Sequence, residues 1–114
     1  PIYDIPETRF VKNLIPQMPL RSSALRCLGA ALNVFAIESF LDEIAHETGQ
    51  DPLQLRLDML GEDRELEYTN HGGPTFNPGR LARLTKFVAE QIGYGKQLPQ
   101  GRGIGIATHF TFGG

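Results

Sequence analysis

The residues best suited to bind a ligand form a short turn, Arg26-Cys27-Leu28-Gly29, directly before the longest amphipathic pattern of the chain. The guanidinium of Arg26 presents a planar fork of hydrogen-bond donors, and the N–H groups in the first turn of a helix lack partners within that helix. An arginine and a glycine turn in this place can therefore bind an anion. The alternative is an ordinary helix start with Arg26 on the surface, which the local sequence alone favours.

The polar residues that follow in the same stretch form no site that we would assign. Asp42 and Glu43 are adjacent, so on a helix they point about 100° apart and cannot act together on one substrate. His46 lies beside Glu43 and Glu47 but lacks a third metal ligand. We therefore predict no metal site, and we assign Glu38 and these four residues to a solvent-exposed face.

The glycine series Gly101-x-Gly103-x-Gly105 and the nearby His109 also fail as sites. A dinucleotide site needs a strand before such glycines and a helix after them, and neither is predicted here. His109 has no evident nucleophile to activate. The sequence therefore predicts no catalytic residue in this chain.

Length and composition indicate one domain, residues 1–114. The chain has 40% hydrophobic and 21% charged residues, as is ordinary for a globular protein. Its net charge of −2 gives no electrostatic argument for binding nucleic acid or an anionic membrane surface. No apolar run approaches the roughly 20 residues of a spanning helix, so we expect a soluble chain.

Cys27 is the single cysteine, which excludes an internal disulfide and a zinc site built from cysteines. A single thiol suits a reducing compartment, and we expect the cytoplasm, with the periplasm as the alternative for a parent protein. The chain starts at Pro1 without Met and stops at Gly114 just after a predicted strand. We therefore expect a piece of a longer polypeptide.

Three predicted helices position these residues, at about 31–47, 52–60 and 78–92. Gly49 is placed to end the first helix in the left-handed conformation. Asp51-Pro52 and Asn77-Pro78 each combine an N-cap with a proline in the first helical position. The expected buried faces, at three-to-four spacing, are Val34, Ile37, Leu41, Ile44 and Ala45; Leu53, Leu57 and Leu60; and Leu81, Leu84, Val88 and Ile92.

Extended regions complete the predicted fold. Near residues 2–5 and 9–14, β-prone residues set among prolines indicate short edge strands. At about 103–112 alternate residues share one strand face, and His109 lies on the opposite face. The residues of that shared face are Ile104, Ile106, Thr108, Phe110 and Phe112. The predicted class is α+β.

The order of these parts is specific. An extended start is followed by the Leu-Arg-x-x-Gly turn, Phe-Ala-Ile-Glu-Ser-Phe-Leu-Asp-Glu-Ile-Ala, Gly-x-Asp-Pro-Leu-x-Leu-Arg, a Leu-rich helix and Gly-Arg-Gly-Ile-Gly-Ile-Ala. This order resembles the molybdopterin-binding large (beta) subunit of the xanthine oxidase family of molybdenum hydroxylases. It is most similar to the bacterial aldehyde dehydrogenase and isoquinoline 1-oxidoreductase branch. The resemblance covers nearly all of the chain and is most specific from Arg26 to Arg56.

The resemblance implies roles at three positions. Arg26 would contact the molybdenum cofactor, because the family has an Arg-x-x-Gly turn before this helix. Leu28 stands in the substrate pocket where the family often has an aromatic residue that stacks on the substrate, so either the substrate shape or this contact differs. Phe112 would line the substrate channel.

The resemblance also implies a chemistry, the oxidative hydroxylation of an aldehyde or N-heterocycle with water as the oxygen source. Electrons would pass to iron–sulfur centres on another subunit or domain. The catalytic glutamate of the family and most of its pterin contacts lie outside the matching segment. We therefore expect this chain to be inactive alone and to hold no cofactor. In the parent enzyme its partners would be the rest of the large subunit and the iron–sulfur subunit or domain.

The competing hypothesis is a stand-alone α+β interaction module without catalysis. Its partner-binding face would comprise Phe35, Phe40 and the helix from Leu53 to Leu60. A piece of a larger subunit would also expose apolar surface that the rest of the subunit covers, so self-association is expected. Reading the gene beyond both ends of the chain separates the two hypotheses.

Overall fold

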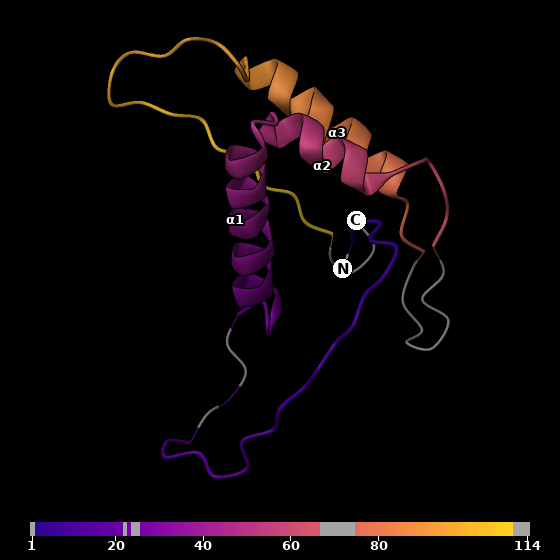
Figure 1. Ribbon diagram of the computed structural model, residues 1–114, viewed down its shortest axis with the longest axis vertical. Helices are drawn as coiled ribbons and strands as arrows, with labels where there is room; N and C mark the ends of the chain where they lie inside the picture. The colour runs from indigo at the N-terminus through magenta and orange to yellow at the C-terminus, as the bar shows by residue number, and fades with distance from the viewer. Residues whose placement is uncertain (1, 22, 24–25, 67–74, 111–114) are drawn as a thin grey trace.

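The computed structural model describes residues 2–21, 23, 26–66 and 75–110. This part of the chain contains three helices, α1 (Ala30–Thr48), α2 (Pro52–Leu60) and α3 (Pro78–Ile92), and no strand (Figure 1). The predicted helices are confirmed, the first within one residue at each end. The predicted α+β class is wrong, because the described residues are helical or irregular.

Local capping explains the ends of these helices. The Asp51 carboxylate accepts a 2.8 Å hydrogen bond from the Gln54 N–H, and the Asn77 side chain accepts one of 2.6 Å from the Arg80 N–H. Each cap satisfies one of the first N–H groups of its helix. Gly49 ends α1 with φ +68°, a left-handed conformation that glycine adopts without a steric penalty.

The predicted strands near 2–5, 9–14 and 103–112 do not form in the described residues. A strand needs a neighbour to pair with, and the described backbone of these segments meets none. In the part of the chain that the structure describes, strand-like pairing is confined to one antiparallel bridge, in which Leu66 and Phe76 exchange hydrogen bonds of 2.8 and 2.9 Å. Residues 111 and 112 lie outside the described part.

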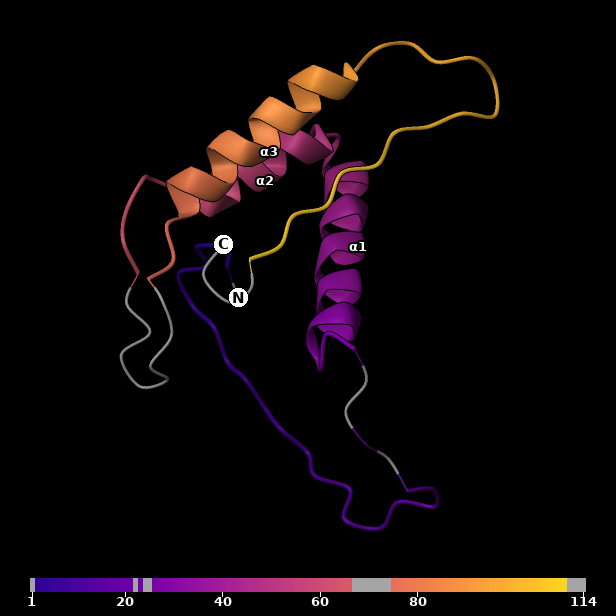
Figure 2. The same cartoon turned by 180° about the vertical axis from the view of Figure 1, so that it is seen from behind.

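The alternation predicted for the C-terminal segment is nevertheless present. Thr108 is buried and its alternate neighbours are half-buried, whereas His109 and the other intervening residues are exposed. The half-buried neighbours are Ile104, Ile106 and Phe110. The segment thus lies with one face on the helices, and Figure 2 shows it crossing α1.

The core lies where α2 packs against both α1 and α3. The N-terminal segment joins it through a 2.7 Å hydrogen bond from the Asp4 N–H to the Met59 carbonyl. Phe110 covers Phe76, with 4.5 Å between ring centroids. The buried hydrophobic cluster consists of Tyr3, Leu41, Ala45, Leu55, Leu60, Phe76 and Leu81.

The buried face of α3 differs from the predicted one. Leu81 is buried as expected, but the row continues through Thr85 and Ala89 at four-residue spacing. Leu84, Val88 and Ile92 are 56%, 44% and 48% exposed. The amphipathic pattern of this helix is wide enough to contain two adjacent rows, and spacing alone does not decide which one is covered.

The faces of α1 and α2 also differ in part from those predicted. On α1, Leu41 and Ala45 are buried, whereas Ile37 remains exposed. On α2 the buried residues are Leu55, Arg56 and Leu60, and the predicted Leu53 and Leu57 are only half-buried.

The described part has no helix long and apolar enough to cross a membrane.

Candidate functional site

The turn before α1 has an unusual backbone. Cys27 and Leu28 have φ angles of +67° and +50°, the left-handed region that side chains other than glycine rarely adopt. The Cys27 carbonyl accepts a 2.8 Å hydrogen bond from the Ala30 N–H, which closes the turn. Two successive residues in this region cost on the order of 1–3 kcal/mol each, and such strain is concentrated at ligand-binding and switch sites.

The start of α1 leaves backbone donors open. The N-cap residue, Gly29, has no side chain that could accept a hydrogen bond from these donors. The Gly29 carbonyl accepts from the Asn33 N–H at 3.1 Å and from the Asn33 side-chain amide at 2.8 Å. No described residue accepts from the N–H groups of Ala31 and Leu32. These two donors and the positive end of the helix dipole attract an anion.

Arg26 is exposed beside this helix start and makes no ion pair with any described residue. Leu28 follows it with its side chain 63% exposed. Of the three site residues predicted from the sequence, the structure therefore places Arg26 and Leu28 in one strained turn. Phe112 lies outside the described residues.

A cavity of about 210 Å³ lies next to this helix start. Ala30, Asn33 and Val34 line it from α1, together with Ile2 from the N-terminal segment and Thr108 and His109 from the C-terminal one. Glu38 is also in its wall. The cavity is mostly apolar, and its polar side chains come from α1 and from the C-terminal segment.

Glu38 is held by a buried hydrogen-bond network, here called the Glu38 network, which joins Tyr3, Glu38, Arg56 and Thr108. The Tyr3 hydroxyl donates to Oε1 at 2.7 Å, and Oε2 accepts from Arg56 Nε at 2.8 Å and from the Thr108 N–H at 3.0 Å. The Tyr3 and Thr108 hydroxyls are 2.9 Å apart. Both carboxylate oxygens thus take part in the network, which fixes the orientation of Glu38 between the three segments.

Arg56 is fully buried and forms the centre of this network. Its remaining donors reach the Glu38 and Pro52 carbonyls at 2.9 and 3.0 Å and the Asp42 carboxylate at 2.8 Å. Burial by itself lowers the pKa of Arg56, but its hydrogen bonds and charge contacts with Glu38 and Asp42 outweigh that effect and raise it. Arg56 therefore stays charged and joins α1 to α2.

Tyr3 has its hydroxyl inside the same network. Burial raises the pKa of Tyr3 above its ordinary value of 10.0, and the nearby Glu38 carboxylate adds to that rise. The hydrogen bond with Thr108 and the charge of Arg56 act in the opposite direction but are not sufficient to reverse it. Tyr3 is consequently a neutral donor at every physiological pH.

This network corrects our assignment of Glu38 to a solvent-exposed face. Glu38 is 5% exposed, whereas Asp42, Glu43, His46 and Glu47 are exposed as expected. One signal in the sequence was available. Glu38 precedes Leu41 and Ala45 by three and seven residues, so it continues the buried row of α1.

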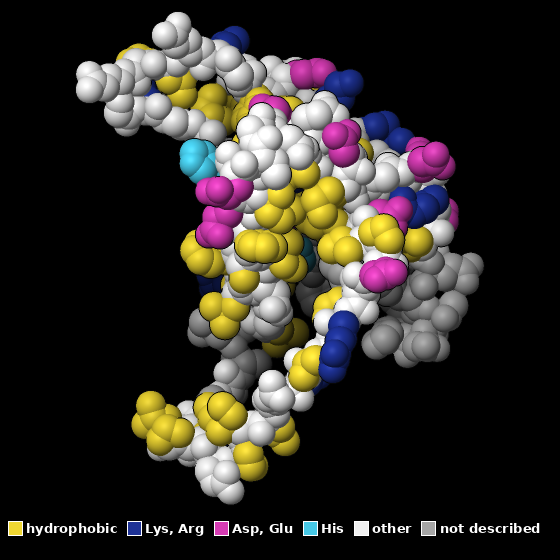
Figure 3. All heavy atoms as spheres, viewed as in Figure 1, with side chains coloured by type: hydrophobic (Ala, Val, Ile, Leu, Met, Phe, Trp, Pro, Cys, Tyr) yellow, Lys and Arg dark blue, Asp and Glu magenta, His cyan; other side chains and the backbone are white. Residues whose placement is uncertain are grey.

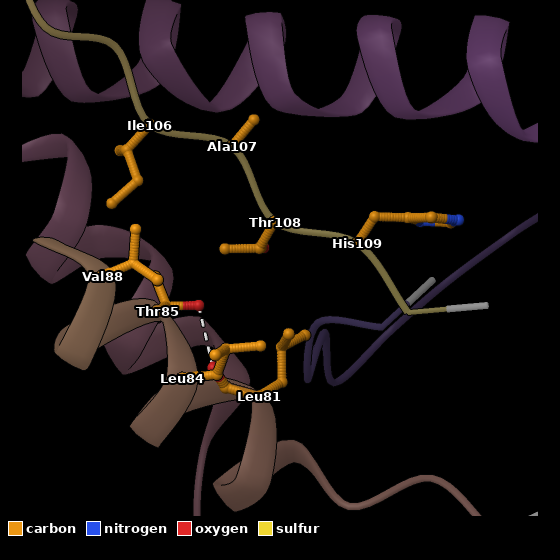
Figure 4. A pocket seen from close by; sticks show the side chains of 8 residues that line it. All are labelled: Leu81, Leu84, Thr85, Val88, Ile106, Ala107, Thr108 and His109. Carbon is orange, nitrogen blue, oxygen red and sulfur yellow. Dashed lines mark hydrogen bonds between the residues drawn. The ribbon is translucent and has the colours of Figure 1, made fainter. Parts of the chain in front are cut away.

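A second cleft, of about 160 Å³, lies between α3 and residues 106–109 (Figure 4). Ile106 and Thr108 point toward α3, and the His109 ring points away from the cleft (Figure 4). The Thr85 hydroxyl donates to the Leu81 carbonyl at 2.8 Å, so it has no hydrogen left to donate to a ligand. The cleft offers mostly apolar contact, and its lining contains no Asp, Glu, Lys or Arg.

The described residues contain no group of three or more His, Cys, Asp or Glu side chains arranged to hold a metal ion. The exposed pair Asp63–Arg83, at 2.6 Å, is separate from the helix start. The hydrogen bond from Arg83 lowers the pKa of the Asp63 carboxyl, and the hydrogen bond from the Asn77 amide lowers it further. The chemistry that this site can perform is therefore the binding of an anion beside an apolar cavity.

Comparison with known proteins finds one matching family model and two related proteins. The molybdopterin cofactor-binding domain model matches residues 1–60. The chain is 30% identical over 104 residues to a membrane-bound aldehyde dehydrogenase [pyrroloquinoline-quinone] of Gluconacetobacter polyoxogenes, covering 88% of this chain and 13% of that protein. It is 36% identical over 67 residues to a nicotinate dehydrogenase subunit of Pseudomonas putida, covering 59% of this chain and 6% of that protein. No solved structure matches the chain.

Proposed function

Because the chain belongs to the molybdopterin cofactor-binding domain family, we propose that it forms part of the cofactor and substrate pocket of a molybdenum hydroxylase large subunit. The matched part of the chain covers 13% of the length of the first relative and 6% of the length of the second. The remaining contacts of such a pocket would come from further polypeptide of the same subunit.

The strained turn before α1 is the observation that carries this proposal. Arg26 is exposed in this turn, and no described residue accepts from the N–H groups of Ala31 and Leu32 in the first turn of α1. The molybdopterin cofactor carries a phosphate, and both kinds of donor suit such an anion. Arg26 would hold the anionic part of the cofactor, and Leu28 would contact the substrate with an aliphatic side chain.

The chemistry itself would come from the molybdenum group, which oxidises the substrate when it is bound. Within the described residues, Glu38 is the one buried carboxylate, and its two oxygens are occupied by Tyr3, Arg56 and Thr108. These bonds give Glu38 a structural role. We also propose that the chain alone neither hydroxylates a substrate nor retains the cofactor, because further polypeptide would complete the pocket.

The substrate class is an aldehyde or an N-heterocycle. The names of the two relatives support these classes, since one is an aldehyde dehydrogenase and the other a nicotinate dehydrogenase subunit. The cavity of about 210 Å³ beside α1 has the mostly apolar lining that either class requires. The electron acceptor would be an iron–sulfur subunit or domain, and we place the protein in the cytoplasm or, for its parent, the periplasm.

The name of the first relative contains a different cofactor, pyrroloquinoline quinone. That cofactor is also anionic, so the turn before α1 would suit its carboxylates as well. The match of the family model to molybdopterin favours molybdenum. Metal analysis and the absorbance of the extracted cofactor distinguish the two.

The turn can be tested with inorganic phosphate as the probe. We expect the amide resonances of Ala31 and Leu32 to shift on titration, and Arg26→Gln to weaken binding about fivefold, equivalent to ~1 kcal/mol. Arg21→Gln is the matched control, because Arg21 is an exposed arginine five positions before the turn. The role of the turn is refuted if Arg26→Gln titrates like the wild-type chain.

The proposed inactivity of the chain has its own test. The chain is purified from a host that makes the molybdenum cofactor, and its molybdenum content is measured. We expect far less than one molybdenum per chain. A stoichiometric content would refute this part of the proposal without affecting the test of the turn.

A further inference from the structure

One face of α1 forms the floor of the cavity of about 210 Å³. This floor begins at Ala30 and ends at Glu38, so it follows the helix axis for about 12 Å. Its members are spaced by three or four residues along the chain, which places them on the same side of the helix. The floor therefore connects the turn proposed to bind an anion with the Glu38 network. Its residues are Ala30, Asn33, Val34, Ile37 and Glu38.

A second wall of the cavity belongs to the C-terminal segment, which crosses α1 (Figure 2) and contributes Thr108 and His109. Within the described part of the chain, no backbone–backbone hydrogen bond involves residues 103–110. Apolar packing holds the segment on the helices, but such packing is non-directional and does not fix the register of the segment. The register is fixed at Thr108, whose N–H donates to Glu38 Oε2 at 3.0 Å and whose hydroxyl lies 2.9 Å from that of Tyr3.

The contacts that orient Glu38 lie inside this chain. Figure 3 shows acidic side chains on the surface of α1, and Glu43 and Glu47 are exposed there. Glu38, by contrast, is 5% exposed, and Arg56, whose Nε donates to it at 2.8 Å, is fully buried. Further polypeptide of the same subunit can add walls to the cavity, but the bonds that orient Glu38 form without it.

We propose that Glu38 is a positioning residue of the substrate pocket. Its carboxylate fixes Thr108, and with Thr108 the adjacent His109, so that this wall of the cavity is in place before a ligand arrives. A wall that is already ordered does not lose conformational freedom when the ligand binds, and affinity is higher for that reason. Glu38 acts through Thr108 and takes no part in the chemistry. This role rests on the proposed function, which assigns the cavity to the substrate.

Two variants separate positioning from stability. Glu38→Leu/Arg56→Met removes both buried charges together, so the fold is retained, but the Thr108 N–H loses its acceptor. Glu38→Gln keeps an oxygen for the Thr108 N–H, and its amide hydrogens can bond to the Tyr3 hydroxyl, which then donates to the Thr108 hydroxyl. Hydrogen exchange at the Thr108 amide reports on this bond directly. We expect protection in the wild-type chain and in Glu38→Gln, and exchange about tenfold faster in the double variant.

Pyridine is the probe for the cavity, because it is a small N-heterocycle and an apolar cavity of about 150 Å³ can hold one aromatic ring. The amide resonances of Val34 and His109 follow the titration. The double variant should bind pyridine about fivefold more weakly, as expected when a side chain must be ordered on binding, whereas Glu38→Gln should bind it like the wild-type chain. Tyr3→Phe keeps both buried charges and removes one contact at Thr108, so it should weaken binding by a smaller factor.

Gly49→Ala is the control for lost stability, because it destabilises α1 at its other end and should leave pyridine binding unchanged. Equal pyridine binding by the double variant and the wild-type chain would overturn the role of Glu38, as would a Glu38→Gln variant that behaves like the double variant. A wild-type chain that binds no pyridine would also overturn it. Titration with phosphate separates these failures from failure of the proposed function, because it reports on the turn before α1 and should give the same dissociation constant in all these variants.

Discussion

Replacement of Arg56 by methionine tests whether the Glu38 network stabilises the fold. The substitution keeps a long side chain in the core but removes every donor that the guanidinium provides. Glu38 then remains buried with only the Tyr3 hydroxyl and the Thr108 N–H as partners. An unpaired buried charge costs about 3–5 kcal/mol.

That cost is a large part of the stability of this chain. At 0.05–0.15 kcal/mol per residue, a domain of 114 residues has a free energy of unfolding of roughly 6–17 kcal/mol. With an m value of about 2 kcal/mol per molar urea, Arg56→Met should lower the urea midpoint by on the order of 2 M. Urea unfolding followed by circular dichroism at constant protein concentration measures this change.

A matched control and a double variant make the test specific. Arg83→Met removes an arginine that pairs with Asp63 at 2.6 Å on the surface, and it should leave the midpoint unchanged. In Glu38→Leu/Arg56→Met both charges are gone, so the loss should be smaller than the sum of the two single losses by about 1–3 kcal/mol. If Arg56→Met unfolds at the same urea concentration as Arg83→Met, the network does not stabilise the fold.

Three further predictions concern Tyr3 and the helix ends. Because folding raises the pKa of Tyr3 above 10.0, the folded state keeps a proton that the unfolded chain loses, so stability should fall above pH 10 by up to ~1.4 kcal/mol per pH unit. Tyr3→Phe should make this decline shallower, and an equal slope in both proteins would contradict the assignment. Gly49→Ala should lower the free energy of unfolding by about 1 kcal/mol because φ is +68°, whereas Gly103→Ala, also in open space but without a positive φ, should not lower it. Asp51→Ala should lower the free energy of unfolding by about 1 kcal/mol, because α2 then loses its N-cap. Asp51→Asn retains a capping side chain and is the control, and thermal unfolding compares the two variants.

The helices could be predicted from the sequence because their signals are local. Asp51-Pro52 and Asn77-Pro78 fix where α2 and α3 begin, and Gly49 and Gly93 supply the left-handed residues that end α1 and α3. Each signal acts within four residues of the helix end that it determines. The agreement between predicted and observed bounds follows from that short range.

The strands and the buried network could not be predicted, because both depend on distant partners. Residues 103–110 show the alternation of a strand, but no described segment lies beside them to pair with. Glu38 has its arginine partner 18 residues away and Thr108 70 residues away. The pattern of α1 alone could not reveal either partner. Of the site, the sequence placed Arg26 and Leu28 in the turn but gave no sign of its strained backbone.

The Glu38 network also orders the events of folding. Glu38 and Arg56 are close in sequence, so α1 and α2 can pair early, whereas the contact between the Tyr3 and Thr108 hydroxyls closes a loop of 105 residues. On the ribosome, residue 108 is made long after the helices, and until it emerges Tyr3 and Glu38 each lack one of their partners. The segment at residue 108 therefore completes the core around the much earlier segment at residue 3, and this late step exposes the nascent chain to misassembly and to chaperones.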